Sequence, residues 1–247
     1  MEAKIDRITP TLRPNDRTVM YQRWARLLFL HWTVPASMLE PMLPPGLTLD
    51  TYEDRAYVGL VPFTMTGVRP IWFPRFPPIT DFHETNVRTY VHYQGANPGV
   101  WFFSLDAANA LAVRVARAMW KLPYHYSRMK LEVQDERIDY QLARSWPAPV
   151  PANLSVRYRP IGPVTHAKPD SLEHFLAERY YLYAYKNGRL YRGQVHHAPY
   201  PLQVAEALDL KESLLESARI ERPDHAPLAH YADELNVRIY PLRTVDQ

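Results

Sequence analysis

Proline is the residue that most restricts how this chain can fold. The sequence contains 24 prolines among 247 residues, roughly twice the usual share of about 5%. Proline has no backbone N–H and is poorly tolerated inside helices and central strands. We therefore expect short, frequently interrupted elements. Aromatic residues make up 13% of the chain, and this content favours strands over helical bundles.

The rest of the composition fits a soluble globular protein and excludes several classes of site. The chain has no cysteine, which excludes disulfides, thiolate catalysis and zinc–cysteine sites. The net charge is +3 without a Lys/Arg-rich block, so we expect no nucleic-acid partner. The N-terminus lacks an apolar signal core, and no apolar stretch is long enough to cross a bilayer. We expect a soluble cytoplasmic protein without a membrane partner.

Local patterns predict many strands and a few helices. Apolar and β-branched runs predict strands over residues 21–32, 47–50, 56–66, 82–93, 100–105, 126–133, 137–144, 153–159, 180–186, 189–197 and 235–240. We expect the strand over 56–66 to be interrupted at Pro62. Helices are predicted over residues 34–43, 107–121 and 170–178. Residues 198–234 read as mixed short helix and loop.

The most specific local signal is Asn187-Gly188 between two predicted strands, which is typical of a hairpin with a type I′ turn. Many strands with two or three helices indicate an α+β fold around a curved or closed sheet.

Six segments carry a resemblance to a known family. They are LPPGLTLD (43–50), LDAANALAV (105–113), LYRGQVHH (190–197), QRW (22–24), VGLVPF (58–63) and ETNVRTYV (84–91). They resemble the YqjF-like bacterial family, a group of unknown function placed in the acetoacetate decarboxylase superfamily. The resemblance covers about residues 17–243. It implies one acetoacetate-decarboxylase-like α+β domain over 17–243, preceded by a flexible arm over 1–16.

The fold implied by the resemblance is a mainly antiparallel sheet, curved or closed into a cone-like barrel, with a few helices. Such a barrel would enclose a cavity for a small molecule. Oligomers are common in the superfamily, so a homo-oligomer is a further expectation.

The resemblance also implies a specific chemistry that this chain lacks residues for. Acetoacetate decarboxylases form a Schiff base between a lysine and the substrate ketone, and a second lysine lowers the pKa of the first. In those enzymes the lysine pair directly follows a proline. Here Pro123 is followed by Tyr124 and His125. Tyr124 cannot form an imine, whereas His125 can act as acid or base. Lys121 is either a displaced Schiff-base lysine or a solvated lysine at a helix end.

The segment after Phe82 places polar residues at alternate positions. In a strand Glu84, Asn86, Arg88 and Tyr90 share one face, which either meets water or lines a polar cavity. In a cavity we expect Glu84 to pair with Arg88, because neither charge is stable there alone. Arg88 can also bind a substrate carboxylate through two hydrogen bonds.

Two further candidates have competing structural roles. Asp106 is either a substrate-binding residue or the N-cap of the helix over 107–121. His196 and His197 are adjacent on a predicted strand, so they point to opposite faces and cannot chelate one ion. We take His196 as a candidate for the cavity without knowing which of the two faces it. We expect no metal and no cofactor, because the chain lacks zinc, nucleotide and nucleophile-elbow motifs.

Three functions remain open from the sequence. The first is an enzyme acting on a small keto acid or related carbonyl compound without a Schiff base. There Glu84 or His125 would be the acid/base and Arg88 the anion anchor. The second is a binding protein that has kept the cavity but lost the nucleophile. The third is a structural protein whose cavity is filled by its own side chains.

Overall fold

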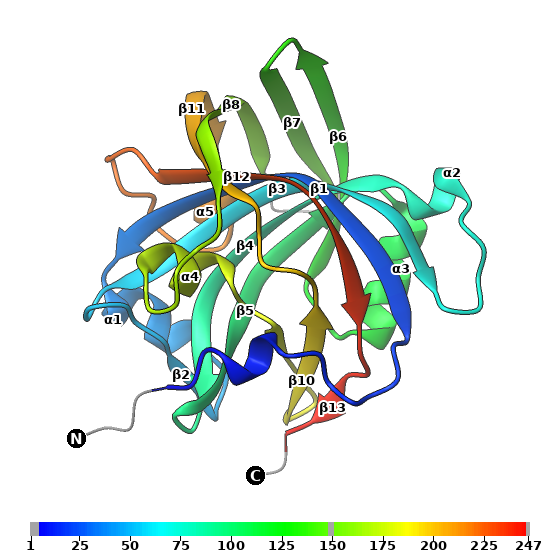
Figure 1. Ribbon diagram of the computed structural model, residues 1–247, viewed down its shortest axis with the longest axis vertical. Coiled ribbons are helices and arrows are strands. Elements are labelled where there is room, and N and C mark those ends of the chain that lie inside the picture. Colours follow the sequence, from blue (N-terminus) through cyan, green and yellow to red (C-terminus); the bar gives the residue numbers. More distant parts are fainter. Residues whose placement is uncertain (1–4, 148–150, 246–247) are drawn as a thin grey trace.

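The computed structural model describes residues 5–147 and 151–245 of the chain. The strands are β1 Met20–Val34, β2 Leu47–Leu49, β3 Ala56–Pro70, β4 Phe82–Tyr93, β5 Ala96–Ala107, β6 Tyr124–Gln134, β7 Arg137–Trp146, β8 Asn153–Thr165, β9 Tyr181–Lys186, β10 Arg189–His196, β11 Leu202–Glu212, β12 Leu228–Ile239 and β13 Arg243–Thr244. The helices are α1 Ala36–Leu39, α2 Pro77–Thr80, α3 Ala110–Met119, α4 Leu172–Ala177 and α5 Leu214–Ser217, with 3-10 turns η1 Thr9–Thr11 and η2 Glu40–Met42. The expected predominance of strands with a few helices is confirmed (Figure 1).

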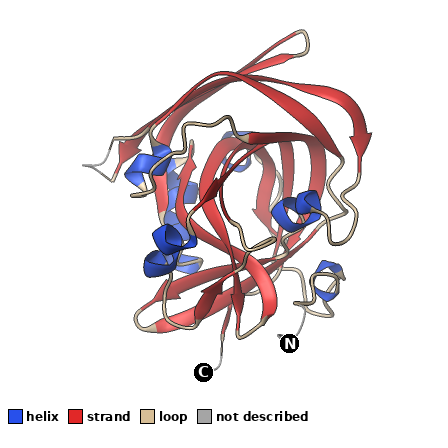
Figure 2. Ribbon diagram, turned by 90° about the vertical axis from the view of Figure 1, so that its left-hand side faces the viewer, coloured by secondary structure: helices blue, strands red, loops and turns tan. Residues whose placement is uncertain are grey.

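The strands form one sheet in the order β13-β10-β9-β5-β6-β7-β8-β11-β12-β1-β3-β4-β2. Two additional pairings, β4 with β5 and β10 with β12, close this sheet on itself, and Figure 2 shows the resulting ring. In the described residues every neighbouring pair is antiparallel except β5–β6 and β5–β9. The expected curved or closed, mainly antiparallel sheet is therefore confirmed.

The two closing pairings divide the ring into two compartments that share the run β12-β1-β3-β4-β5. We call first ring the loop that β9 and β10 complete, and second ring the loop that β6, β7, β8 and β11 complete. Phe29, Phe63 and Val237 belong to the hydrophobic core inside the first ring. Leu30 and Tyr140 belong to a separate core inside the second. The shared strands therefore bury both of their faces.

Burial on both faces explains the sequence of β1. Residues Leu27 to Trp32 are all buried, including His31. An alternating strand would expose every second side chain, whereas a strand between two cores is apolar on both sides. The same pattern holds in β3, where Ala56–Phe63 is continuously buried.

The proline content misled the sequence analysis about element length. β1 and β3 are each 15 residues long, and Pro62 lies inside β3 without interrupting it. Pro62 is opposite Thr85 of β4 but has no register partner on β1, because β1 is irregular between Ala25 and Leu30. The proline, which has no N–H to donate, therefore lies at an irregularity where the strand has no hydrogen-bonding partner on the β1 side.

Two other local expectations need revision, whereas the hairpin is confirmed. Asn187 and Gly188 have φ values of 54° and 75°, as a type I′ turn requires. The main helix is shorter than predicted, and its N-cap is Asn109 rather than Asp106, since the Asn109 side chain accepts from the N–H groups of Leu111 and Ala112. Residues 198–234 contain the expected short helix and loop, α5 and the residues after it, but also two long strands that were not predicted, β11 and most of β12.

The described part of the N-terminal segment lies against the domain. Arg7 forms an ion pair with Asp50, and the Gln194 side chain donates to the Pro10 carbonyl at 3.4 Å. Figure 1 shows η1 next to β10. Among the described residues, none of the helices has the length and apolar character needed to cross a membrane.

We expect Gly99→Ala to destabilise the protein by disturbing the β5–β9 pairing, which is part of the first ring. Gly99 of β5 lies opposite Tyr181 of β9, and an added Cβ would sit 2.6 Å from the Tyr181 carbonyl oxygen. Overpacking a rigid contact costs up to about 3 kcal/mol. Gly95→Ala is the control, because its added Cβ meets no atom within 4 Å at a φ of 75°, a conformation that costs roughly 1 kcal/mol. Urea unfolding that shows equal losses for the two variants would contradict this reading.

Candidate active site

The first ring encloses a cavity of about 190 Å³. Its walls come from β1, β3, β4, β5, β6, β9, β10 and β12, and α3 covers one side. Most of the lining is apolar and aromatic: Trp24, Leu27, Phe29, Val61, Phe63, Met65, Phe102, Leu105, Val115 and Trp120. Polar groups in such surroundings lose their hydration and are expected to find partners within the protein or a ligand.

A polar row on β4, made of Glu84, Asn86 and Arg88, lines this cavity. Each of the three is buried, with at most 8% of its surface exposed. The side chains between them point into the second ring, where Thr85 bonds the Tyr140 hydroxyl at 2.9 Å. The alternation predicted for this strand is therefore observed, with the row facing the cavity.

Glu84 is held next to a tyrosine rather than next to a cation. The Tyr124 hydroxyl donates to Oε2 of Glu84 at 2.8 Å. Burial raises the pKa of Glu84 to about 8, and the negative charge of Asp106 contributes in the same direction. At neutral pH most molecules therefore carry a protonated Glu84, which can donate a proton or a hydrogen bond.

The expected ion pair between Glu84 and Arg88 is wrong. The two residues are four positions apart on one strand, which separates their Cα atoms by about 13 Å. Arg88 instead donates to the Leu176 carbonyl at 3.1 Å. Its Cζ atom lies 5.6 Å from the ring centres of both Phe29 and Tyr90. In the described part of the chain, Arg88 has no carboxylate partner.

Positive charge exceeds negative charge at this end of the cavity. Arg179, which also lines the cavity, pairs with Asp50 at 2.6 Å, and Arg7 pairs with the same carboxylate. Arg88 and Arg179 both lie over the Tyr90 ring. Two guanidinium groups thus share one carboxylate, and the third, that of Arg88, has none.

Three buried polar atoms on the cavity lining have no hydrogen-bond partner. They are Nε of Arg88, Nη2 of Arg179 and Oδ1 of Asn86. An unsatisfied buried donor or acceptor costs about 1–3 kcal/mol. Two of the three atoms are guanidinium donors, and guanidinium groups pair well with carboxylates.

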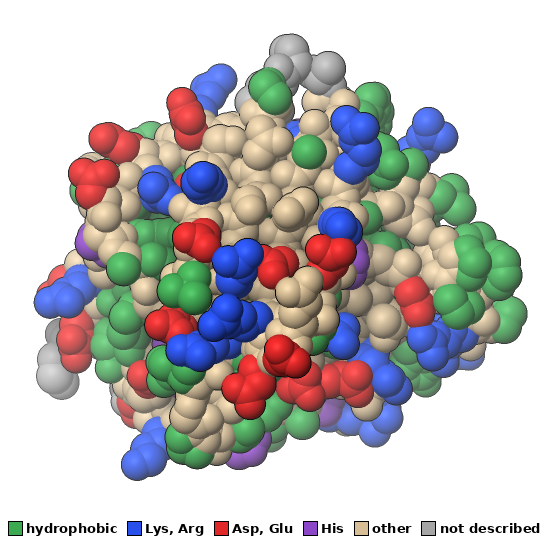
Figure 3. All heavy atoms as spheres, turned by 90° about the horizontal axis from the view of Figure 1, so that it is seen from above, with side chains coloured by type: hydrophobic (Ala, Val, Ile, Leu, Met, Phe, Trp, Pro, Cys, Tyr) green, Lys and Arg blue, Asp and Glu red, His purple; other side chains and the backbone are tan. Residues whose placement is uncertain are grey.

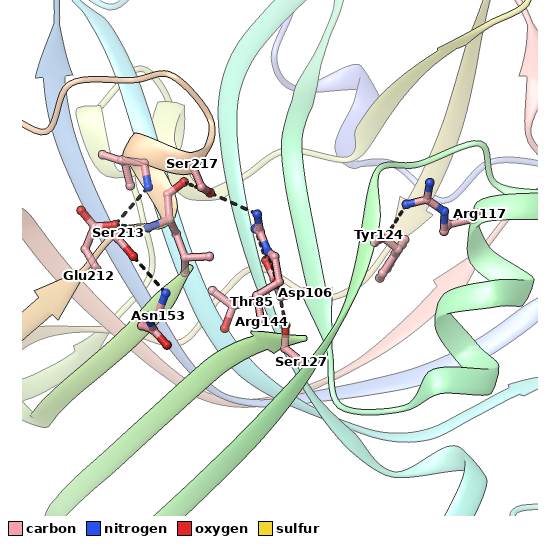
Figure 4. Close-up of polar contacts among 12 residues, drawn as sticks. Thr85, Asp106, Arg117, Tyr124, Ser127, Arg144, Asn153, Glu212, Ser213 and Ser217 are labelled. Carbon is pink, nitrogen blue, oxygen red and sulfur yellow. Dashed lines mark hydrogen bonds and ion pairs between the residues drawn. The ribbon is translucent and has the colours of Figure 1, made fainter. Parts of the chain in front are cut away.

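Asp106 and His125 lie on the other side of the sheet. Asp106 is opposite Thr85 and His125 in the register, so both face the second ring. Arg144 donates to the two oxygens of Asp106 at 2.8 and 2.7 Å, and Ser127 donates at 2.7 Å (Figure 4). This buried ion pair ties β5 to β6 and β7, which accounts for the position of Asp106 without a ligand.

The cavity contains Tyr124 but not its neighbour. Tyr124 is opposite Leu105, another cavity residue, whereas His125 shares its face with Asp106. Burial and the charge of Arg144 lower the pKa of His125 to about 4. His125 is therefore neutral at physiological pH and does not line the cavity.

The remaining sequence candidates lie outside the cavity. Lys121 follows α3 with a φ of 59°, and its Nζ lies 4.5 Å from the Tyr191 ring centre. Tyr90 is fully buried behind Arg88 and donates to the Leu176 carbonyl at 2.8 Å. His196 faces outward, because Val195 is the residue of β10 that lines the cavity.

His197, not His196, is the buried histidine of this pair. Its ring stacks on Tyr180 at 4.5 Å and lies 4.6 Å from the ring of Tyr200, a cavity residue. Burial lowers the pKa of His197 to about 4. Within residues 5–147 and 151–245, no group of three or more His, Asp or Glu side chains is arranged to hold a metal ion.

Sequence reasoning missed Arg179 and its partner Asp50. Arg179 follows α4, in a stretch where charged residues are surrounded by apolar and aromatic ones. A cationic residue in an apolar and aromatic stretch could have indicated that Arg179 is buried. Its partner is 129 positions away in the chain, and only the closed sheet brings the two together.

Comparisons with known proteins agree with the observed fold. The model of the family described as DUF2071, uncharacterized conserved protein, matches residues 21–240. The uncharacterized protein YqjF of Bacillus subtilis is 40% identical over 230 residues, which cover 93% of this chain and 94% of the relative.

Solved structures with a similar fold have a low sequence identity to this chain. The enduracididine biosynthesis enzyme MppR in complex with pyruvate has a TM-score of 0.63 at 12% identity, covering 95% of this chain and 92% of that one. Acetoacetate decarboxylase from Legionella pneumophila has a TM-score of 0.60 at 15% identity, covering 95% and 90%. The superfamily fold expected from the sequence is confirmed.

The raised pKa of Glu84 predicts how stability depends on pH. Between about pH 4.5 and pH 8 the unfolded chain is ionised at Glu84 while the folded chain keeps the proton. Unfolding therefore releases a proton, and the stability of the wild type relative to Glu84→Gln falls by up to about 1.4 kcal/mol per pH unit in this window. Below about pH 4.5 the wild type keeps its full stability relative to Glu84→Gln, and above about pH 8 this stability falls no further. Urea unfolding of both proteins from pH 5 to about 9 measures the difference.

Tyr124→Phe is the matched control for this titration. The Tyr124 hydrogen bond favours the ionised form of Glu84, so its removal should extend the fall in stability to higher pH. A stability difference between wild type and Glu84→Gln that does not change with pH would show that Glu84 titrates normally.

Proposed function

The chain belongs to the DUF2071 family of uncharacterized conserved proteins, and from that premise we propose that its cavity binds a small keto acid or related carboxylate. We further propose that the protein acts on this ligand by acid/base chemistry without a lysine imine. The observation that carries the proposal is the buried Arg88, which lines the cavity and lacks a carboxylate partner among the described residues.

The polar row suggests one orientation for the ligand. A carboxylate at one end can accept from the free Nε of Arg88 and Nη2 of Arg179. Alternate residues of a strand are about 7 Å apart, so the next atoms of a short keto acid lie over Asn86. A ligand with a longer chain is needed for a second carbonyl group to reach Glu84 and Tyr124 at the other end.

Protonated Glu84 supplies the proposed chemistry. A carboxyl group whose pKa is about 8 can donate a proton to a carbonyl oxygen as that oxygen gains negative charge. The apolar walls exclude water and so strengthen this interaction. MppR, which has the same fold, has been solved in complex with pyruvate, a keto acid of the proposed chemical class.

A Schiff base receives no support from the cavity. None of the described residues that line it is a lysine. The position after Pro123 holds Tyr124, whose hydroxyl bonds Glu84. Lys121 lies at a different groove, with its ammonium group over Tyr191.

A non-catalytic binding protein is the second candidate. The absence of a lysine from the described lining favours it, since a cavity that has lost its nucleophile can still bind the ligand. A structural protein with a filled cavity is less well supported, because about 190 Å³ remains open beside three unsatisfied polar atoms.

Binding is tested by titrating pyruvate and acetoacetate calorimetrically into the wild type and Arg88→Gln. Loss of a charge-assisted hydrogen bond should weaken binding by about 10- to 100-fold. Arg114→Gln is the control, because Arg114 is exposed on α3 and does not line the cavity. Unchanged affinity in Arg88→Gln would exclude Arg88 as the anion anchor.

Catalysis is tested by following exchange of keto-acid α-hydrogens in deuterated water by NMR. If Glu84 is the acid, it gives its proton to the carbonyl oxygen while a solvent molecule takes the α-proton. The exchange rate then falls as the pH rises past about 8, and Glu84→Gln abolishes exchange while ligand still binds. Binding without exchange would instead assign the protein as a binder. Borohydride reduction in the presence of acetoacetate should leave the intact mass unchanged, and an adduct on Lys121 would establish the imine route.

A further inference from the structure

A second concave site lies on the outer face of the strands that form the first ring. It has a volume of about 590 Å³. Its basic lining consists of Arg13, Arg23, Arg69, Arg75, Arg238 and His196. We call it the arginine groove. No Asp or Glu is among the described residues that line it.

Strand alternation places this groove opposite the cavity. Along β1, Met20 and Trp24 line the cavity, Tyr21 and Arg23 line the groove, and Gln22 borders both. The two sites are therefore separated by the thickness of one sheet.

Backbone pairing gathers the positive charges in a row. Tyr21 is directly opposite Arg69 on β3 and Arg238 on β12. Arg238 is in turn opposite His196 on β10. Cross-strand neighbours lie about 5 Å apart, so the register fixes these groups close together. The Arg69 guanidinium also lies over the Tyr21 ring at 5.6 Å.

Carboxylates compensate only part of this charge. Arg75 pairs with Asp81 at 2.6 Å, and Arg23 pairs with Glu234 at 3.4 Å. The other three arginines have no carboxylate partner among the described residues: Arg13, Arg69 and Arg238. Burial lowers the pKa of His196, and the positive charges of Arg13 and Arg238 act in the same direction.

Elsewhere on the surface, basic side chains lie next to acidic ones and pair with them. Figure 3 shows basic and acidic side chains interspersed on the face that carries the ends of β6, β7, β8 and β11. There Arg157 pairs with Asp139 at 2.9 Å and Arg159 with Glu206 at 2.7 Å. The groove differs because three of its arginines, Arg13, Arg69 and Arg238, have no carboxylate partner among the described residues.

From this convergence we propose that the arginine groove binds a small molecule bearing two or more anionic groups, such as an organic phosphate. Unpaired like charges on neighbouring strands are destabilising, and an anion between them would remove the repulsion. Guanidinium groups match phosphate and carboxylate oxygens through paired hydrogen bonds. The proposal is independent of the cavity and of its reaction.

The shape of the groove favours a small ligand over a polymer. Its volume falls within the range of about 300–1,000 Å³ that is usual for small-molecule sites. Arg13 of the N-terminal segment and Arg75 of the β3–α2 loop contribute to the lining along with β1, β3, β10 and β12. A site built by these separate segments surrounds its ligand more than an open basic stripe does.

The test is calorimetric titration of inorganic tripolyphosphate and of citrate at constant ionic strength. We expect binding by the wild type and a loss of about 100-fold in the double variant Arg69→Gln/Arg238→Gln, at roughly tenfold per contact. Tighter binding of tripolyphosphate assigns a phosphate ligand, and tighter binding of citrate assigns a polycarboxylate. Binding of neither overturns the proposal.

The double variant Arg128→Gln/Arg137→Gln is the matched control. It removes the same charge from two exposed residues on β6 and β7 and should bind tripolyphosphate like the wild type. An equal loss in this control would mean that only net charge matters, which overturns a defined site. Loss of binding in Arg88→Gln would place the anion in the cavity instead.

A structural role for the arginines predicts a different result. Without an anion, the Arg69→Gln/Arg238→Gln protein should melt at the same temperature as the wild type or higher, because repulsion is relieved. A clear fall in melting temperature would make these residues structural and overturn the proposal. Binding that requires long oligonucleotides and is absent for tripolyphosphate would assign the groove to a polymer and overturn it as well.

Discussion

The burial of β4 on both of its faces is the constraint on which this structure depends. Its odd-numbered residues Thr85 and Val87 pack into the second ring, while Glu84, Asn86 and Arg88 line the first. Neither set can move to solvent, because a one-residue slip would exchange the faces. The polar row is therefore fixed within an apolar ring and must satisfy its charges locally.

The cost of burying a charge is reduced in different ways at the two ends of the polar row. At one end the proton remains on Glu84, and Tyr124 supplies a hydrogen bond, so no net charge is buried. At the other end the charge of Arg88 persists, and only a carbonyl group and two aromatic rings offset it. A cation left in this state stabilises the folded chain less than a paired one would. A ligand carboxylate would supply the missing partner, which connects the energetic cost to function.

Sequence patterns predicted those parts of the molecule that depend on near neighbours. Strand alternation located the polar row, and Asn187-Gly188 located a hairpin. Features that depend on distant pairing were missed. β11 and β12 are rich in Ala, Leu and Glu, whose helix propensity concealed strands that exist only through pairing with β8 and β1. The partner of Glu84 was also missed, since Tyr124 lies 40 positions away.

The parallel pairing of β5 with β6 determines which chemistry this cavity can contain. It sets Tyr124 beside Leu105 on the cavity face and His125 beside Asp106 on the other. Of the two residues that follow Pro123, only the first reaches Glu84, and the second meets the Asp106–Arg144 ion pair. An amine at the first position would face a carboxyl group and draw off its proton. A phenol does not, so Glu84 stays protonated, and under the proposed function this acid takes the place of the amine.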